Sequence, residues 1–328
     1  MIPEEIRNRT ILVTPLNWGL GHATRSYPII KRLISNNNRV ILASDGGSLL
    51  WLKNEFKDLT IHSLPELKMK YSKSRGAMGG IILKLPHFLK SIKKDFKSIA
   101  RIIEKENIDL IISDNRYGAY SSGIHSIIIT HQLRINHPLG KMLNLPFKNL
   151  IEKFDEVWVP DFDNNELSGD LSKPYEKFSI PVIFIGPQSR FGEAKGIKKE
   201  FKYLSIVSGP EPHKSQLNQA IEAHFKKLDT ECAMVLGNAR DVEFVKKDKL
   251  AIWSNPSTSE LESLIDKSEV VICRSGYSSI MDMHIKQKRV LLIPTPGQPE
   301  QIYLAKHHDK SGLFTGVFTK KDFLDFVN

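Results

Sequence analysis

The sequence predicts an α/β protein of two domains, each a doubly wound parallel sheet, that face each other across a cleft. Three observations support this fold class. At 328 residues, the chain is longer than one typical domain. Short apolar segments typical of buried parallel strands alternate with amphipathic segments typical of helices. A polar, glycine-containing stretch at 187–202 separates the halves, so we expect Rossmann-like domains at 1–186 and 203–328, joined by a linker.

The composition is that of a globular protein with a basic surplus: 41% hydrophobic residues, 26% charged residues and a formal net charge of +10. The N-terminus is polar, and no apolar run approaches the ~20 residues of a membrane span. Cys232 and Cys273 lie in apolar, strand-like segments, so we expect buried free thiols in a cytoplasmic protein. The basic residues are not interleaved with aromatic ones, so we expect no nucleic-acid partner.

The first domain opens with a βαβ pattern, with strands expected at 10–15 and 39–43. The loop between the first strand and its helix contains Gly19, Gly21 and His22. A histidine at a helix N-terminus has a lowered pKa and can accept a proton, so His22 is a candidate catalytic base. The alternative is a histidine that only hydrogen-bonds a neighbouring carbonyl.

Polar residues follow two further strands, expected at 108–113 and 126–130. Asp114 ends the first of them and His131 the second. Because open α/β sheets bind ligands at the carboxyl ends of their strands, we predict that both residues bind an acceptor or orient His22. Capping of the two loops is the alternative for each.

An Asp-Phe-Asp string at 161–163 follows a strand expected at 156–159. Paired aspartates of this kind bind a metal in some enzymes that act on nucleotide diphosphates. Nothing near them in the sequence completes a set of ligands, so we expect no metal.

The segment 65–101 contains ten lysine and arginine residues against two acidic ones. Its centre, 78–89, is apolar. Basic residues around an exposed apolar centre suit an anionic membrane face. The alternative is a loop followed by an amphipathic helix at 88–103 that packs on the sheet and exposes its lysines.

The segment 269–305 has a β-α-β-loop-α pattern, with strands expected at 270–273 and 290–293 and a helix at 277–286. Arg274 and Gly276 lie in the turn before this helix, where Gly276 allows close approach of a ligand. Ser278 lies in the first helical turn and Asp282 one turn later. Anion donors at a helix N-terminus with a carboxylate one turn away suit a nucleotide diphosphate attached to a ribose.

These motifs, RSGYSSIMD at 274–282 and PTPGQPEQ at 294–301, resemble the signature of the GT-B glycosyltransferases. The resemblance is closest to the glycosyltransferase 28 group, which contains the peptidoglycan N-acetylglucosaminyltransferase. It implies donor-binding roles for these residues, with Asp282 in place of the usual glutamate: Gly19, Gly21, Ser208, Gly209, Arg274, Gly276, Ser278, Asp282, Gln298 and Gln301.

The resemblance further implies metal-independent transfer of a hexose or N-acetylhexosamine from a UDP-sugar to an acceptor hydroxyl, with no cofactor. Carbohydrate and lipid-linked acceptors are both open, the latter with peripheral contact of 65–101 at the inner face of the membrane. Two alternatives are a nucleotide-sugar hydrolase that shares the G-x-G-H loop and a nucleotide-sugar sensor without catalysis. Product analysis without an acceptor would separate the first of these from a transferase.

Overall fold

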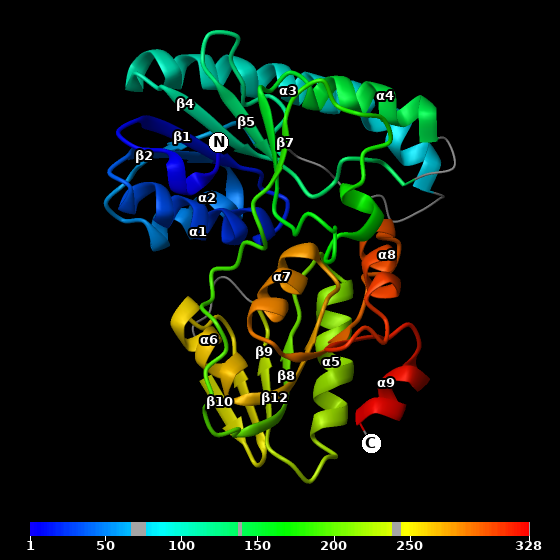
Figure 1. The fold of residues 1–328 in the computed structure, drawn as a ribbon. Helices are drawn as coiled ribbons and strands as arrows, with labels where there is room; N and C mark the ends of the chain where they lie inside the picture. The colour runs from blue at the N-terminus through cyan, green and yellow to red at the C-terminus, as the bar shows by residue number, and fades with distance from the viewer. Residues whose placement is uncertain (67–76, 137–139, 238–243, 328) are drawn as a thin grey trace. The chain divides into compact units, whose positions relative to one another are not determined.

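The computed structural model describes residues 1–66, 77–136, 140–237 and 244–327 (Figure 1). The chain divides into two compact units, Met1–Gln188 and Ser189–Asn328. Each unit is built around its own seven-stranded sheet. The predicted fold class, two doubly wound sheets, is confirmed in each unit.

The first sheet is parallel throughout, in the order β3-β2-β1-β4-β5-β6-β7. Its order reverses between β1 and β4, which makes the carboxyl ends of these two strands the expected ligand position. The strands are β1 (Thr10–Pro15), β2 (Arg39–Ser44), β3 (Thr60–Ser63), β4 (Leu110–Asp114), β5 (Ser126–Ile129), β6 (Glu156–Val159) and β7 (Val182–Phe184).

Helices cover both faces of this sheet: α1 (Gly21–Ser35) and α2 (Gly46–Glu55) on one, α3 (Ala77–Glu106) and α4 (Gly140–Ile151) on the other (Figure 1). Successive side chains of a strand point to opposite faces, so β1 contributes to both cores. Ile11 and Val13 pack with α1, whereas Leu12 packs with Ile99 and Ile102 of α3. This two-sided burial explains why β1 is apolar without alternation.

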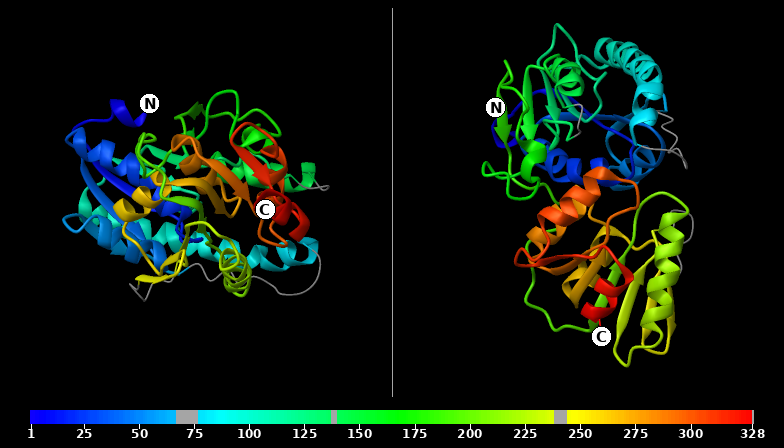
Figure 2. Two further views of the ribbon diagram at one scale, coloured as in Figure 1. Left: turned by 90° about the horizontal axis from the view of Figure 1, so that it is seen from below. Right: turned by 90° about the vertical axis from the view of Figure 1, so that its right-hand side faces the viewer.

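The second sheet has the order β10-β11-β9-β8-β12-β13-β14, with only β10 antiparallel to its neighbour. It reverses between β8 and β12. The strands are β8 (Phe201–Ile206), β9 (Cys232–Val235), β10 (Phe244–Lys247), β11 (Leu250–Trp253), β12 (Ser268–Cys273), β13 (Arg289–Leu292) and β14 (Phe314–Gly316). The helices are α5 (His213–Phe225), α6 (Thr258–Asp266), α7 (Tyr277–Ile285), α8 (Pro299–His307) and α9 (Lys320–Val327), and Figure 2 shows α5 and α9 beside the strands.

Most of the expected strands are present, and both cysteines are buried and free as predicted. Three short strands, β3, β10 and β14, were not expected because polar residues and glycine interrupt their apolar pattern. The helix expected at 88–103 is longer, since α3 begins at Ala77 and includes most of the glycine-containing stretch. Within the described residues, no helix is long and apolar enough to cross a membrane.

The segment 187–202, predicted as a linker, makes several hydrogen bonds to the second unit. Gly192 N–H donates to Glu262 at 2.9 Å, and Lys199 Nζ donates to the carbonyl of Asp266 at 2.6 Å. The buried Lys286 ammonium donates to the carbonyl of Glu193 at 3.1 Å. This stretch is therefore held along the second unit by its own backbone.

Candidate functional site

The carboxyl edge of the first sheet brings together the three residues predicted to be catalytic. Asp114 is the last residue of β4, and the loop after β1 places His22 in the first turn of α1. His131 follows β5. The main-chain N–H of Leu16 donates to the carbonyl of Asp114 at 3.0 Å, so the β1 loop starts beside the end of β4. Parallel pairing of neighbouring strands is what collects these residues, which lie far apart in the sequence.

His22 and Asp114 form a hydrogen-bonded pair, with 2.8 Å between His22 Nδ1 and Asp114 Oδ1. The carboxyl group is fully buried, and the imidazole is 13% exposed. An ionised carboxylate can only accept, so Nδ1 of His22 carries the proton and Nε2 holds the lone pair. The pair has the arrangement in which a carboxylate orients a histidine as a general base.

Arg25 joins this pair and was missed by the sequence analysis. Its Nε donates to Asp114 Oδ2 at 2.7 Å, its Nη2 donates to Asp114 Oδ1, and its Nη1 lies 3.1 Å from His131 Nδ1. Ser26 Oγ also donates to Asp114 Oδ2, at 3.2 Å. The available signal was an arginine three residues after His22, on the same face of the helix. Arg25 is buried, which a charged residue tolerates only when it is paired.

The pKa values of the pair follow from burial and from these charges. Burial alone would raise the pKa of Asp114, but the Arg25 guanidinium and the His22 imidazole lower it to about 2. Burial lowers the pKa of His22 below its usual value, and the charge of Arg25 adds to this, against the opposing effect of Asp114. The cluster therefore holds a permanently ionised carboxylate beside a neutral imidazole at physiological pH.

The glycine-containing loop before His22 is fixed by one side chain, Asn17. Its Oδ1 accepts from the N–H of Ser48 at 3.2 Å, and its Nδ2 donates to Asp45 Oδ2 at 3.4 Å. Gly19 has a φ of +77°, a conformation that L side chains rarely adopt. The loop exposes half of Trp18, at 50%, in the sequence position directly before Gly19.

In the second unit, Arg274 follows β12 and is buried. Its Nη2 donates to the carbonyl of His213 at 2.9 Å, and its Nη1 donates to the carbonyl of Pro294 at 3.1 Å. Its Nε has no hydrogen-bond partner within the described part of the chain. Arg274 thus connects the start of α5 to the loop after β13, and its charge lies at the carboxyl edge of the second sheet.

Asp282 lies on α7 and accepts a hydrogen bond from Ser189 Oγ at 2.6 Å. Burial raises its pKa to about 6, although Arg190 and Ser189 act in the opposite direction. Gly276 is the N-cap of α7 and Ser278 lies in its first turn, where main-chain N–H groups have no partner inside the helix. The predicted features of an anion site therefore occur together on this one helix.

The other predicted donor residues lie in loops at the same edge. Ser208 and Gly209 follow β8 and are exposed, and Gly209 has a φ of +121°. Gln298 is the N-cap of α8. Gln301 is partly committed to the loop itself, because its Oε1 accepts from the N–H of Thr295 at 2.8 Å. The structure thus brings Ser208, Gly209 and Arg274 to one sheet edge through β8 and β12.

The Asp-Phe-Asp string has a structural role in the first unit. Asp161 is buried, and its carboxylate accepts from the N–H groups of Phe162, Leu167 and Ser168 at 2.7, 3.1 and 2.8 Å. Asp163 is exposed. Across the described residues, no group of histidine, cysteine, aspartate and glutamate side chains could hold a metal ion.

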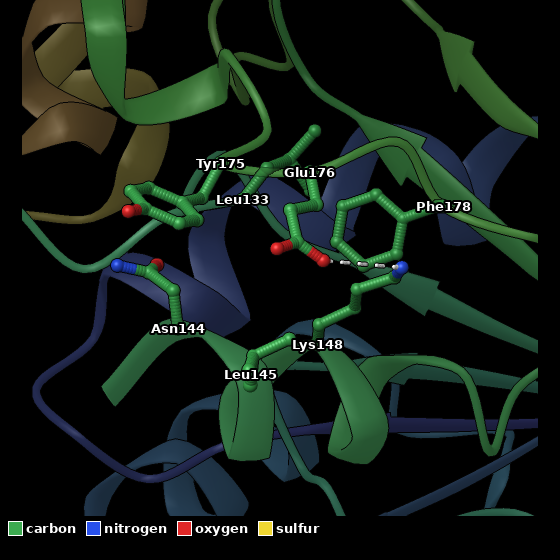
Figure 3. A pocket seen from close by; sticks show the side chains of 7 residues that line it. All are labelled: Leu133, Asn144, Leu145, Lys148, Tyr175, Glu176 and Phe178. Carbon is green, nitrogen blue, oxygen red and sulfur yellow. Dashed lines mark ion pairs between the residues drawn. The ribbon is translucent and has the colours of Figure 1, made fainter. Parts of the chain in front are cut away.

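A small pocket lies close to the His131 loop, and Figure 3 shows its lining. An ion pair of Lys148 and Glu176, 4.0 Å apart, and the ring of Tyr175 border it. Its lining residues are Leu133, Asn144, Leu145, Lys148, Tyr175, Glu176 and Phe178. Since Leu133 is two residues from His131, the pocket is continuous along the chain with the catalytic candidates, and its polar groups could contact a hydroxylated ligand.

Comparison with known proteins identifies relatives of both units. Residues 205–320 match the family model of the glycosyltransferase family 28 C-terminal domain. An uncharacterized glycosyltransferase of Methanopyrus kandleri is 21% identical over 306 residues, which cover 84% of this chain and 83% of that protein.

A second relative, from Fusobacterium nucleatum, is a UDP-N-acetylglucosamine–N-acetylmuramyl-(pentapeptide) pyrophosphoryl-undecaprenol N-acetylglucosamine transferase. It is 20% identical over 259 residues, covering 72% of this chain and 70% of the relative. Among solved structures, the glycotransferase of kitacinnamycin superposes with a TM-score of 0.64 at 16% identity, covering 95% of this chain and 86% of that one. The predicted resemblance to family 28 and the predicted GT-B fold are confirmed.

Proposed function

This chain is a glycosyltransferase with the GT-B fold and a family 28 C-terminal domain, and on that premise we propose that it transfers a hexose or N-acetylhexosamine from a UDP-sugar to an acceptor hydroxyl. The observation that carries the proposal is the His22–Asp114 pair, 2.8 Å apart, at the carboxyl edge of the first sheet. It provides a neutral, oriented base, which an acceptor hydroxyl needs because its own pKa is far above 7.

In the proposed reaction, the acceptor O–H gives its proton to Nε2 of His22 while the acceptor oxygen bonds to the anomeric carbon of the sugar. The bond from that carbon to the diphosphate oxygen breaks, and UDP leaves with the bonding electrons. Asp114 stabilises the imidazolium that forms, because its ionised oxygen accepts from Nδ1 of the same ring. The proton is then lost to water, which restores the neutral base.

The second unit would hold the donor. The N-terminus of α7, with Gly276 and Ser278, and the charge of Arg274 would stabilise the departing diphosphate without a metal. Asp282 would accept from the ribose hydroxyls through the oxygen that Ser189 does not occupy. Support for a UDP-sugar comes from the Fusobacterium nucleatum relative, whose name specifies UDP-N-acetylglucosamine.

We assign a lipid-linked acceptor, because the outer helices of the first unit combine basic and apolar side chains. On α3, Lys90, Lys93, Lys94 and Lys97 are exposed beside Leu89 and Phe96, and on α4 Met142 is 59% exposed. Tyr117 contacts both helices through Phe88 and Phe147. Such a surface suits peripheral contact with an anionic membrane at its cytoplasmic face. Most of the 65–89 part of the predicted basic segment lies outside the residues whose side chains the structure describes.

The test combines binding and turnover. Thermal shifts are measured with UDP, GDP, dTDP and their sugars, and a rise in Tm with UDP and UDP-sugars alone is expected. Release of UDP is then followed with and without a polyprenyl-linked acceptor. A Tm rise with dTDP or GDP instead would overturn the donor assignment.

The same assay separates the alternatives. A hydrolase would release free sugar at full rate without an acceptor, since His22 could deprotonate water as readily as a hydroxyl. A sensor would bind the nucleotide sugar without turnover, and His22→Ala would change nothing. Acceptor-dependent UDP release that His22→Ala abolishes would support the transferase.

A further inference from the structure

The structure points to a role for the buried Arg25 that reaches beyond its ion pair with Asp114. Arg25 lies in the second turn of α1, and its guanidinium contacts an acidic and a basic partner at once. Nε and Nη2 bind both oxygens of Asp114, and Nη1 lies 3.1 Å from Nδ1 of His131. One side chain therefore connects the carboxylate and the second histidine.

We infer that Arg25 fixes His22 and His131 in opposite neutral tautomers, so that His22 alone can accept a proton and His131 can only donate a hydrogen bond through Nε2. The inference deepens the proposed function and rests on it for its catalytic consequence, but the positions of the protons follow from the contacts themselves. Arg25 is accordingly a positioning residue.

The tautomer of His131 follows from the chemistry of its neighbour. A guanidinium has N–H donors and no acceptor, so the 3.1 Å contact requires a lone pair on Nδ1 of His131. The proton of the neutral ring is then on Nε2. A second proton on Nδ1 would place two N–H groups and two positive charges against each other in a buried site. His131 therefore cannot serve as the base while Arg25 is in place.

The tautomer of His22 is fixed through Asp114. Oδ1 accepts from His22 Nδ1 at 2.8 Å and from Arg25 Nη2, while Oδ2 accepts from Arg25 Nε and Ser26 Oγ. With both oxygens held, the carboxylate cannot turn away from the ring. His22 keeps its proton on Nδ1 and its lone pair on Nε2.

The charges that face His22 come from three elements: Asp114 at the end of β4, Arg25 on α1 and His131 after β5. Arg25 and Asp114 cancel each other, and Arg25 keeps His131 uncharged. Loss of Arg25 would leave His22 beside an unneutralised carboxylate, which favours the imidazolium. His22 would then hold its proton to a higher pH.

The test uses the whole protein with ¹⁵N-labelled histidine and no ligand. Two-bond ¹H–¹⁵N spectra across pH 5 to 9 report the tautomer and titration of each ring, and His22→Gln and His131→Gln assign the two signals. We expect Nδ1–H for His22, Nε2–H for His131 and no protonation of His131 in this range. Nδ1–H or an imidazolium at His131 in the wild-type spectrum would overturn the inference, even if every Arg25 variant failed to fold.

Variants extend the test to Arg25 itself. Arg25→Gln should make His131 titratable and raise the pKa of His22 by about one unit, and the acid limb of kcat/KM for UDP-sugar turnover should move up equally. Arg32→Gln, two turns later on α1 and paired with Glu4 on the surface, is the matched control and should leave both rings unchanged. Unchanged rings in a folded Arg25→Gln protein would refute the role of Arg25. Correct tautomers without turnover would refute only the transferase proposal.

Discussion

The carboxyl edges of the two sheets have the same topology and opposite chemistry. Both lie where the strand order reverses, at β1 and β4 in the first unit and at β8 and β12 in the second. In the first, His22, Arg25 and Asp114 bond to one another through their side chains. In the second, Arg274 is bonded to main-chain carbonyls, and the loops around it are rich in glycine, serine and proline.

This difference shows how one arrangement of strands can serve two tasks. A side-chain network fixes the position of a proton, which acid–base chemistry requires. A loop edge with a helix N-terminus offers main-chain N–H groups, which a diphosphate requires. The comparison predicts that substitutions in the first edge change the rate of reaction, whereas substitutions in the second change nucleotide affinity and stability.

The largest effect is expected at the first edge. His22→Ala and Asp114→Asn should each lower kcat by about 10²–10⁴-fold, because the first removes the base and the second removes the charge that orients it. Affinity for UDP, measured by calorimetry, should stay within about twofold of the wild type. A loss of UDP affinity equal to the loss of kcat would contradict the division of tasks between the edges.

Arg274→Lys should have the next largest effect, mainly on binding. The lysine keeps the charge but cannot reach the carbonyls of His213 and Pro294 together, so UDP affinity should fall about 10–100-fold and stability by roughly 1–3 kcal/mol. Urea unfolding gives the stability and calorimetry the affinity. Arg289→Lys, at the amino end of β13, where the arginine lies over the ring of Phe326, is the control and should change neither by much.

A smaller effect is expected at the outer surfaces, where the units differ again. Replacing Lys90, Lys93, Lys94 and Lys97 of α3 by glutamine should weaken binding to anionic vesicles about tenfold or more, since each cation contributes on the order of 1 kcal/mol near such a surface before screening by salt. Co-sedimentation with phosphatidylglycerol vesicles measures this. The matched double variant Lys320→Gln and Lys321→Gln on α9 should sediment like the wild type. Equal losses in both would mean that the contact is not specific to α3.

The smallest effect concerns Asp282, whose pKa in the folded protein is about 6. The folded state holds this proton more tightly than the unfolded state, so the stability that protonation provides declines as pH rises from about 4 to 6. Asp282→Asn should therefore raise stability at pH 7 by on the order of 1 kcal/mol and have no effect near pH 4. UDP affinity should fall several-fold if the carboxylate binds the ribose. A variant that is less stable at pH 7 would show that burial does not penalise this carboxylate.

Part of the site could be predicted from residue types and their positions along the chain. His22, Asp114 and His131 could be selected because each lies at the end of a buried strand, directly after one, or at a helix N-terminus, and such positions meet at one edge of a parallel sheet. Arg25 could not, because nothing in a helical arginine tells whether it faces solvent or a buried carboxylate. The Asp-Phe-Asp string shows the opposite case, since its first aspartate caps a loop with three main-chain N–H groups.

The sequence by itself determined the two parallel sheets, because runs such as 11–13 and 270–273 are apolar on both faces and need helices on each side. It also determined the anion-binding character of the turn at Arg274, whose residue types carry that chemistry. Only the tertiary structure decided which charges neutralise one another. Residues 22, 25, 114 and 131 become neighbours through strand order and packing, and burial then sets their pKa values, which no local pattern records.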